Sequence, residues 1–200
     1  MAQLILASTS RYRRELLERL RVPFTVRAPD AGEANLPGEP PAALAERLAA
    51  AKARGVAAPP DAVVIGSDQV ASLDGRRLRK PGTHAVALRQ LLDAQGRVVE
   101  FHTAITVLDH TTGRAWAHVD RTAVHFARLP EAALDRYLTL EEPYDCAGSF
   151  KSEGLGIVLF ERIVTEDPTA LVGLPLIWLG RTLAAAGLDP LALTQAPSAR

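Results

Sequence analysis

Apolar residues along the chain follow two different spacings, which predicts that strands and helices alternate. Short runs of consecutive apolar residues are typical of buried strands, whereas apolar residues that recur every three or four positions are typical of helices. The runs predict strands at 4–7, 24–26, 62–65, 98–108, 115–126 and 156–163. The helical spacing predicts helices at 11–20, 42–56, 83–94, 130–140 and 174–186.

Turn signals between these elements favour an α/β protein with a mixed sheet. Asp74-Gly75 and Thr111-Thr112-Gly113 are hairpin-type turns, which join antiparallel neighbours. The alternation of strands with helices is typical of the α/β class. A chain of 200 residues is expected to form one domain or two small lobes. We therefore expect a single domain over 1–200, with a frayed tail from about residue 193.

Composition argues against several classes of protein. The 23 basic and 23 acidic side chains give a formal net charge of zero, which argues against a nucleic-acid-binding protein. Anions must then be bound by local clusters of positive charge. The single cysteine, Cys146, excludes an internal disulfide framework and is typical of a reducing compartment. We expect a cytoplasmic protein without a signal peptide or membrane span, because no apolar run is long enough for either.

The segment from Ser8 to Arg14 places hydroxyls and arginines where a predicted strand meets a predicted helix. Backbone N–H groups at a helix start point toward bound anions, and arginine offers paired donors to phosphate. Three arginines at this position oppose the helix dipole, which favours acidic residues in the first turn. The alternative interpretation is structural: Ser10 caps the helix, and Arg13 is solvated or pairs with a nearby glutamate.

Two further candidate groups are Asp68 and Lys80. Asp68 comes shortly after the apolar run 62–65, and a desolvated carboxylate is costly unless it is paired or binds a metal. Asp68 is therefore a candidate metal ligand or general base, the alternative being a residue that caps a turn. Lys80 precedes Pro81, which holds it extended. It is a candidate point charge for a phosphate, or else a solvated lysine in a basic run.

Small and polar residues gather in the segment 146–156, CAGSFKSEGLG, where glycines would let the backbone approach a ligand. The alternative is an ordinary loop. Glu33 and Lys52 are typical surface residues when taken alone. The five histidines share no metal-ligand spacing and are expected at the surface or on sheet faces. Together these patterns predict a metal-dependent enzyme that acts on a phosphate ester or nucleotide, without identifying the base.

Five separated motifs, in order and over nearly the whole chain, resemble the Maf family of nucleotide pyrophosphatases: LILASTSRYRRELLERL, GSDQV, KPGT, CAGSFKSEGLG and LVGLPL. The GSDQV and CAGSFKSEG forms resemble the subfamily that acts on 7-methyl-GTP. The resemblance implies hydrolysis of a nucleoside triphosphate to the monophosphate and pyrophosphate, with a divalent cation, Mg²⁺ or Mn²⁺. It also implies a Maf-like (inosine triphosphatase-like) α/β fold, with two lobes around a central cleft, a cytoplasmic location and a homodimer.

The resemblance also implies roles for individual residues. Asp68 would be the proton acceptor, with Lys52 and Lys80 as further catalytic groups. The residues implied in substrate specificity are Tyr12, Gln69 and Glu153. The residues implied in phosphate binding are Ser8, Arg13 and Arg14, and those implied in metal binding are Asp68 and Glu33. This chain departs from the family pattern at Arg11, where proline is usual, at Tyr12, where the subfamily has tryptophan, and at Gly32, where an aspartate is usual.

The implied specificity residues suit a methylated guanine. Methylation at N7 makes the base cationic, so that Tyr12 would stack on it with a cation–π gain of about 0.5–2 kcal/mol. Glu153 would accept from the N1–H and N2–H₂ groups, and Gln69 would bond another edge. Two alternatives stay open: the same reaction on dTTP, UTP or other nucleotides, and a nucleotide-binding regulator of septum formation with little turnover.

Overall fold

The computed structural model describes residues 2–32, 34 and 36–193, which form a seven-stranded mixed sheet flanked by helices. The sheet order is β2-β1-β3-β5-β6-β7, with β4 paired to β3. The strands are β1 (Gln3–Ala7), β2 (Phe24–Arg27), β3 (Ala62–Leu73), β4 (Arg76–Leu78), β5 (Val98–Asp109), β6 (Ala115–Phe126) and β7 (Phe160–Val164). The helices are α1 (Arg11–Glu18), α2 (Pro41–Arg54), α3 (His84–Ala94), α4 (Glu131–Glu141), α5 (Leu176–Ala185), α6 (Pro190–Leu193) and the 3-10 helices η1 (Leu155–Leu159) and η2 (Ala170–Val172).

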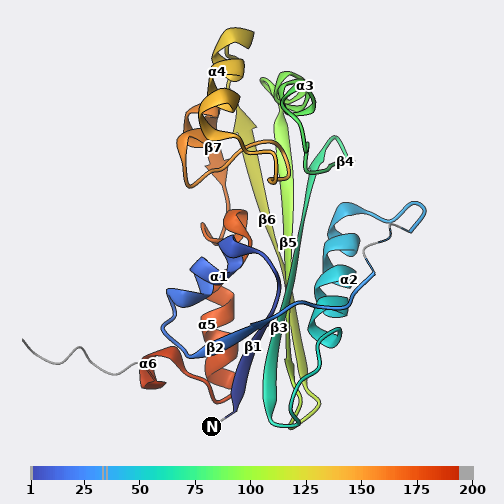
Figure 1. Cartoon of the computed structure of the whole chain (residues 1–200), viewed down its shortest axis with the longest axis vertical. Coiled ribbons are helices and arrows are strands. Elements are labelled where there is room, and N and C mark those ends of the chain that lie inside the picture. The colour runs from blue at the N-terminus through green and yellow to red at the C-terminus, as the bar shows by residue number, and fades with distance from the viewer. Residues whose placement is uncertain (1, 33, 35, 194–200) are drawn as a thin grey trace, which may run out of the picture.

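Three long antiparallel strands, β3, β5 and β6, run the length of the molecule (Figure 1). The parallel strand β1 pairs with the first half of β3 as far as Gly66, and β4 joins the same edge only from Ala71. Residues 67–70 of β3 therefore have no strand beside them on this edge among the described residues. We call the end with β1 and β2 the lower half and the end with β4 and β7 the upper half.

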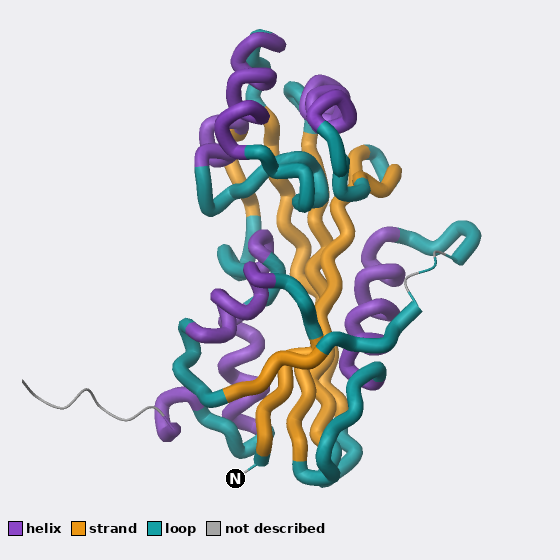
Figure 2. Tube along the Cα trace, in the orientation of Figure 1, coloured by secondary structure: helices purple, strands orange, loops and turns teal. Residues whose placement is uncertain are grey.

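Helices cover the two halves differently (Figure 2). In the lower half, α1 and α5 pack their leucines against Val63 and Ile65 of β3. On the other face, α2 packs against Val70 and Ala104. In the upper half, α3 and α4 pack on the sheet around Phe101. None of the helices in the described part of the chain has the length and apolarity needed to cross a bilayer.

The structure confirms the predicted α/β class and mixed sheet, and most elements lie within a few residues of the predicted bounds. Two predictions were wrong. The strand predicted at 62–65 continues to Leu73, because β5 pairs with it residue for residue from Val63 to Leu73. Residues 156–159, predicted as part of a strand, lie in η1, because β6 ends at Phe126 and pairs with the chain only from Phe160. The predicted frayed tail after residue 193 lies outside the described residues.

The contact between α2 and β3 depends on a glycine. A Cβ at Gly66 would lie 2.3 Å from the carbonyl oxygen of Ala49 and 2.4 Å from the backbone nitrogen of Ala53, both on α2. Real side chains do not tolerate such distances to backbone atoms, so that the helix approaches the sheet this closely only because residue 66 has no side chain.

We predict that Gly66→Ala will lower the free energy of unfolding by at least 2 kcal/mol, roughly the middle of the range for overpacking a core, because α2 must move away from β3. Urea unfolding of both proteins measures this change. The matched control is Gly180→Ala on α5, where a Cβ meets nothing within 4 Å, and where alanine favours the helix. Equal stability of the Gly66→Ala variant and the wild type would contradict the prediction.

Candidate active site

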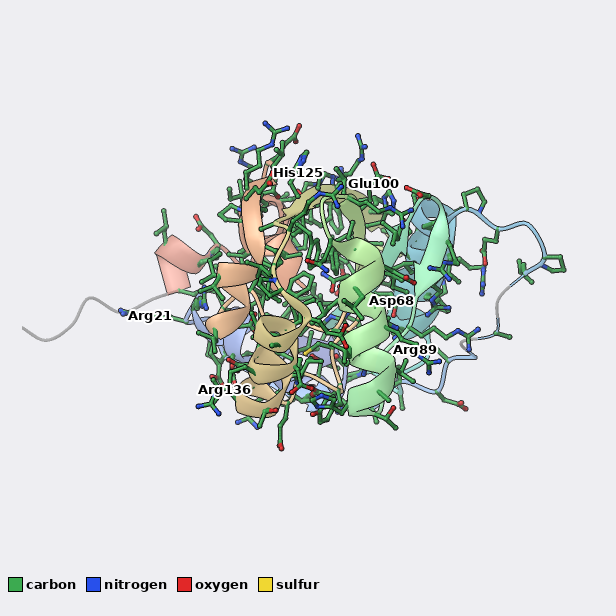
Figure 3. All side chains as sticks on the ribbon, turned by 90° about the horizontal axis from the view of Figure 1, so that it is seen from above. Arg21, Asp68, Arg89, Glu100, His125 and Arg136 are labelled. Atoms are coloured by element: carbon green, nitrogen blue, oxygen red, sulfur yellow. The ribbon has the colours of Figure 1, made fainter. Side chains whose placement is uncertain are left out.

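A cavity of about 990 Å³ lies at the uncovered edge of β3. Its size is at the upper end of the range for small-molecule sites, about 300–1,000 Å³. Its polar lining comes mainly from residues 8–13, Lys52 of α2, residues 68 and 69 of β3, residues 77–80, and the segment 145–153, and Leu171 and Val172 of η2 also contribute. Viewed along the long axis, Asp68 lies within the outline of the molecule, whereas Arg21 and Arg136 lie at its periphery (Figure 3).

Most residues implied by the resemblance meet in this cavity. Those that line it are Ser8, Tyr12, Arg13, Lys52, Asp68, Gln69, Lys80 and Glu153. Arg14 does not line it: its Nε donates to Glu18 Oε1 at 3.0 Å, and the pair borders a separate shallow hollow beside β2. The structure therefore does not place Arg14 with the other candidate phosphate ligands. Glu33, the second implied metal ligand, lies outside the described residues.

The polar centre of the cavity is an ion pair between Asp68 and Lys52. Lys52 Nζ donates to Asp68 Oδ1 at 2.7 Å. Asp68 is 7% exposed and Lys52 is 9% exposed. Such burial is costly for either charge alone and is compensated here by the partner. The close packing of α2 on Gly66 brings the lysine to this position. No described residue donates to Asp68 Oδ2, so that this oxygen is available to a ligand or water.

Neighbouring residues of β3 both reach the cavity, although they point to opposite faces of the sheet. Asp68 points toward the face covered by α2, and Gln69 points toward η2. Both side chains can reach the same cavity because, among the described residues, no strand pairs with this edge of β3 at residues 67–70. The Nε2 of Gln69 donates to the carbonyl oxygens of Ala170 at 3.1 Å and Leu171 at 2.9 Å.

The start of α1 forms another wall. Ser10 caps the helix and accepts from Arg13 N at 3.4 Å, as the structural interpretation of the sequence predicted. Its own N–H donates to Ser8 Oγ at 3.1 Å. Arg13 also lines the cavity, with its Nε donating to Gly173 O at 3.1 Å. The structural and ligand-binding interpretations of this segment are thus compatible, because Ser10 caps the helix that carries Arg13 to the cavity.

Positive charge is concentrated here although the whole chain is neutral. Among the described residues, six lysines and arginines line the cavity against three carboxylates. Arg11 belongs to the predicted anion-binding segment, whereas no role was predicted for Arg77 and Arg79. Arg77 and Arg79 flank Leu78 in the basic run before Pro81, and the hairpin of β3 and β4 turns them toward the site. The charge density of that run was the signal that could have identified them.

Tyr12 and Cys146 form a neutral corner of the cavity. Tyr12 Oη lies 3.6 Å from Cys146 Sγ and accepts from an Arg11 guanidinium nitrogen at 2.8 Å. Burial raises the pKa of Tyr12 to about 12 and the pKa of Cys146 to about 11. Both groups therefore keep their protons at neutral pH. The guanidinium of Arg11 also lies over the Tyr12 ring, 4.7 Å from its centroid, so that this face already holds a cation.

Glu153 reaches the cavity from the segment 146–156, whose other charged side chain, Lys151, points elsewhere. Its Oε2 accepts from Ser152 Oγ at 3.2 Å, and the residue is exposed. Lys151, two positions earlier, donates through Nζ to the backbone oxygen of Glu141 at 2.7 Å. Lys151 is therefore engaged with the end of α4, while Glu153 lines the cavity.

The cavity suits a hard cation that is bound together with phosphates. Among the described residues there is no group of three or more His, Cys, Asp and Glu side chains that could hold a metal alone. Mg²⁺ commonly binds through one or two carboxylates, with substrate phosphates and water completing its shell. The available Asp68 Oδ2 fits this pattern.

Comparison with known proteins gives a consistent picture. A family model described as Maf-like protein matches residues 3–186. A 7-methyl-GTP pyrophosphatase from Burkholderia orbicola (strain AU 1054) is 58% identical over 197 residues, which cover 96% of this chain and 94% of the relative. One from Burkholderia pseudomallei (strain K96243) is 58% identical over 98% of this chain and 93% of the relative. One from Albidiferax ferrireducens is 55% identical over 94% of this chain and 96% of the relative.

We predict that Cys146 reacts with iodoacetamide about two orders of magnitude more slowly than free cysteine at pH 8, because its raised pKa leaves little thiolate. The rate should rise about tenfold per pH unit up to about pH 10, since the thiolate fraction grows until the pH passes the pKa. Mass spectrometry measures the rate at the single cysteine, and Cys146→Ser is the blank. A profile that levels off near pH 8.5 would show an ordinary thiol instead.

Proposed function

Since the chain belongs to the Maf family, we propose that it hydrolyses 7-methyl-GTP to 7-methyl-GMP and pyrophosphate at this cavity. The observation that carries the proposal is the Lys52–Asp68 pair, which places a buried carboxylate with one available oxygen among six cations. Relatives of 55–58% identity that are named 7-methyl-GTP pyrophosphatase support the choice of substrate.

Asp68 is the proposed proton acceptor. Lys52 holds Oδ1, which orients the carboxylate and leaves Oδ2 to take a proton from water. The water oxygen forms a bond to the α-phosphorus. The bond from the α-phosphorus to the oxygen that bridges to the β-phosphorus breaks, and pyrophosphate leaves with that electron pair. The proton on Asp68 is then returned to solvent or to the leaving group.

The lysines and arginines that line the cavity stabilise the negative charge that develops on the departing pyrophosphate. Lys80 and Arg13 line the cavity, and Ser8 with the start of α1 supplies hydroxyl and backbone donors. Arginine is suited to this role because its planar fork matches two phosphate oxygens. Arg77 and Arg79 add two positive charges to the cavity lining beyond the residues implied by the sequence.

A divalent cation, Mg²⁺ or Mn²⁺, is part of the proposal. The phosphate oxygens would hold it, with Asp68 and Glu33 as the carboxylates implied by the sequence. When bound, the cation would neutralise phosphate charge and acidify a bound water. In the same site, Lys52 keeps the Asp68 side chain in one orientation.

Base recognition in this proposal uses charge. The 7-methylguanine ring is cationic, so that the exposed carboxylate of Glu153 attracts it and accepts from its N2–H₂ group. The Tyr12 ring already holds one cation, the Arg11 guanidinium, on its face, and it would bind the cationic base in the same way. The base displaces Arg11 from this face or uses the opposite one.

The first prediction concerns the proton acceptor. Asp68→Asn should lower kcat for pyrophosphate release from 7-methyl-GTP by about 10²–10⁴, the usual contribution of a general base. The assay uses a panel of 7-methyl-GTP, GTP, dTTP, UTP, CTP and ATP with Mg²⁺ and with Mn²⁺. The matched control is Asp145→Asn, which removes another carboxylate that lines the cavity.

The panel also decides between the alternatives. Release mainly from dTTP or UTP would keep the mechanism and refute the substrate. Binding without release from any nucleotide would favour a nucleotide-dependent regulator of septum formation instead of an enzyme.

The second prediction concerns the base. Glu153→Gln should lower the preference for 7-methyl-GTP over GTP about tenfold in kcat/KM, because the variant loses its charge attraction to the methylated base. Glu161→Gln, on the exposed part of β7, is the control for loss of a carboxylate elsewhere. An unchanged preference in Glu153→Gln would assign the discrimination to other residues.

A further inference from the structure

The amide group of Gln69 has only one chemically reasonable orientation. Three oxygen atoms surround its Nε2: Ala170 O at 3.1 Å, Leu171 O at 2.9 Å and Thr103 Oγ1 at 2.9 Å. Backbone carbonyl oxygens can only accept hydrogen bonds, so that the NH₂ end must face them. The reversed amide would place Oε1 against two carbonyl oxygens without a proton between them.

Thr103 completes this arrangement. It lies opposite Gln69 on β5, is fully buried, and donates through Oγ1 to Ala170 O at 2.9 Å. With its proton committed to Ala170, the hydroxyl oxygen can serve only as an acceptor for Gln69 Nε2. The three acceptors together use both protons of the amide. The remaining polar atom of Gln69 is Oε1, on a side chain that lines the cavity.

Hydrogen bonds to Asp167 tie down the segment that carries the two carbonyl groups. Asp167 Oδ1 accepts from the N–H of Thr169 at 2.9 Å, and Asp167 Oδ2 accepts from the N–H of Ile177 at 2.7 Å. The hydroxyl of Thr169 donates within the same turn. Asp167 is 4% exposed, so that these bonds are shielded from water. The orientation of Gln69 is therefore supported by a rigid segment.

We propose that Thr103 is a positioning residue, which together with the η2 carbonyls fixes Gln69 with Oε1 toward the cavity. Gln69 then acts only as an acceptor, and we place its Oε1 against N1 of a purine or N3 of a pyrimidine. In that position the site selects bases with a ring N–H donor and rejects bases whose ring nitrogen is unprotonated. Guanine, 7-methylguanine, hypoxanthine, uracil and thymine belong to the first class; adenine and cytosine belong to the second. This inference rests on the proposed function, because it assumes that the cavity binds the base of a nucleotide.

A matched pair of ligands tests the inference without turnover. ITP and ATP differ at the base only in that hypoxanthine has N1–H beside a carbonyl, whereas adenine has bare N1 beside an amine. Their α,β-methylene analogues cannot be split at the bond in question. Calorimetry with Mg²⁺ gives the two dissociation constants for the wild type, Thr103→Val and Thr103→Ser. Thr182→Val, a buried threonine on α5, is the control for general loss of stability.

The wild type should bind the ITP analogue at least about tenfold more tightly, because adenine leaves an acceptor facing an acceptor. Thr103→Val should reduce this ratio about three- to tenfold, the effect of losing one hydrogen bond, whereas Thr103→Ser should restore it. Thr182→Val should keep the wild-type ratio even where its melting temperature falls.

Three results would overturn the inference. In the first, the wild type binds both analogues equally or prefers the ATP analogue. In the second, Thr103→Val keeps the wild-type ratio, which would limit Thr103 to a structural role. In the third, the wild type binds neither analogue. Pyrophosphate release from 7-methyl-GTP, measured separately on the same preparations, tests the proposed function independently of these ratios.

Discussion

The ion pair between Lys52 and Asp68 is the interaction on which the organisation of this site depends. Neither charge is stable alone at this depth, so that the helix carrying the lysine and the strand carrying the aspartate must approach closely. Gly66 permits that approach, and the absence of a neighbouring strand at residues 67–70 leaves the pair open to a ligand. One break in the strand pairing thus opens the cavity beside this buried carboxylate.

A second constraint comes from backbone carbonyl groups around η2. Gly173 O accepts from Arg13 Nε and from Ser67 Oγ, while Ala170 O and Leu171 O accept from Gln69. Three side chains from two distant parts of the sequence are thereby set at fixed angles by one short turn. Hydrogen-bond chemistry, and not only shape, decides which polar atoms each of them can present to a ligand.

Sequence patterns identified much of the fold and most of the cavity. The motif around Asp68 stood out because a carboxylate follows an apolar strand, and the run before Pro81 stood out because the proline holds Lys80 extended. Both lie at the site. Arg13 and Arg14 could not be separated by pattern, because adjacent helical residues differ in direction by about 100° and only the packed structure shows which one faces the cavity. Thr103 carries no local signal, since its role arises from pairing with a strand more than thirty residues away. The extension of β3 past Gly66 was missed for the same reason.

The three long strands that cross both halves also limit how the molecule moves. Domain-closing enzymes usually bend at a few linker residues. Here β3, β5 and β6 pass without interruption from one half to the other, so that bending would strain many paired residues at once. Capture of a nucleotide and escape of its products must therefore proceed through local rearrangements of side chains and loops. Displacement of Arg11 from the Tyr12 ring, one of the two proposed ways for the base to bind, would be such a movement, with a timescale set by side-chain rotation and not by domain closure.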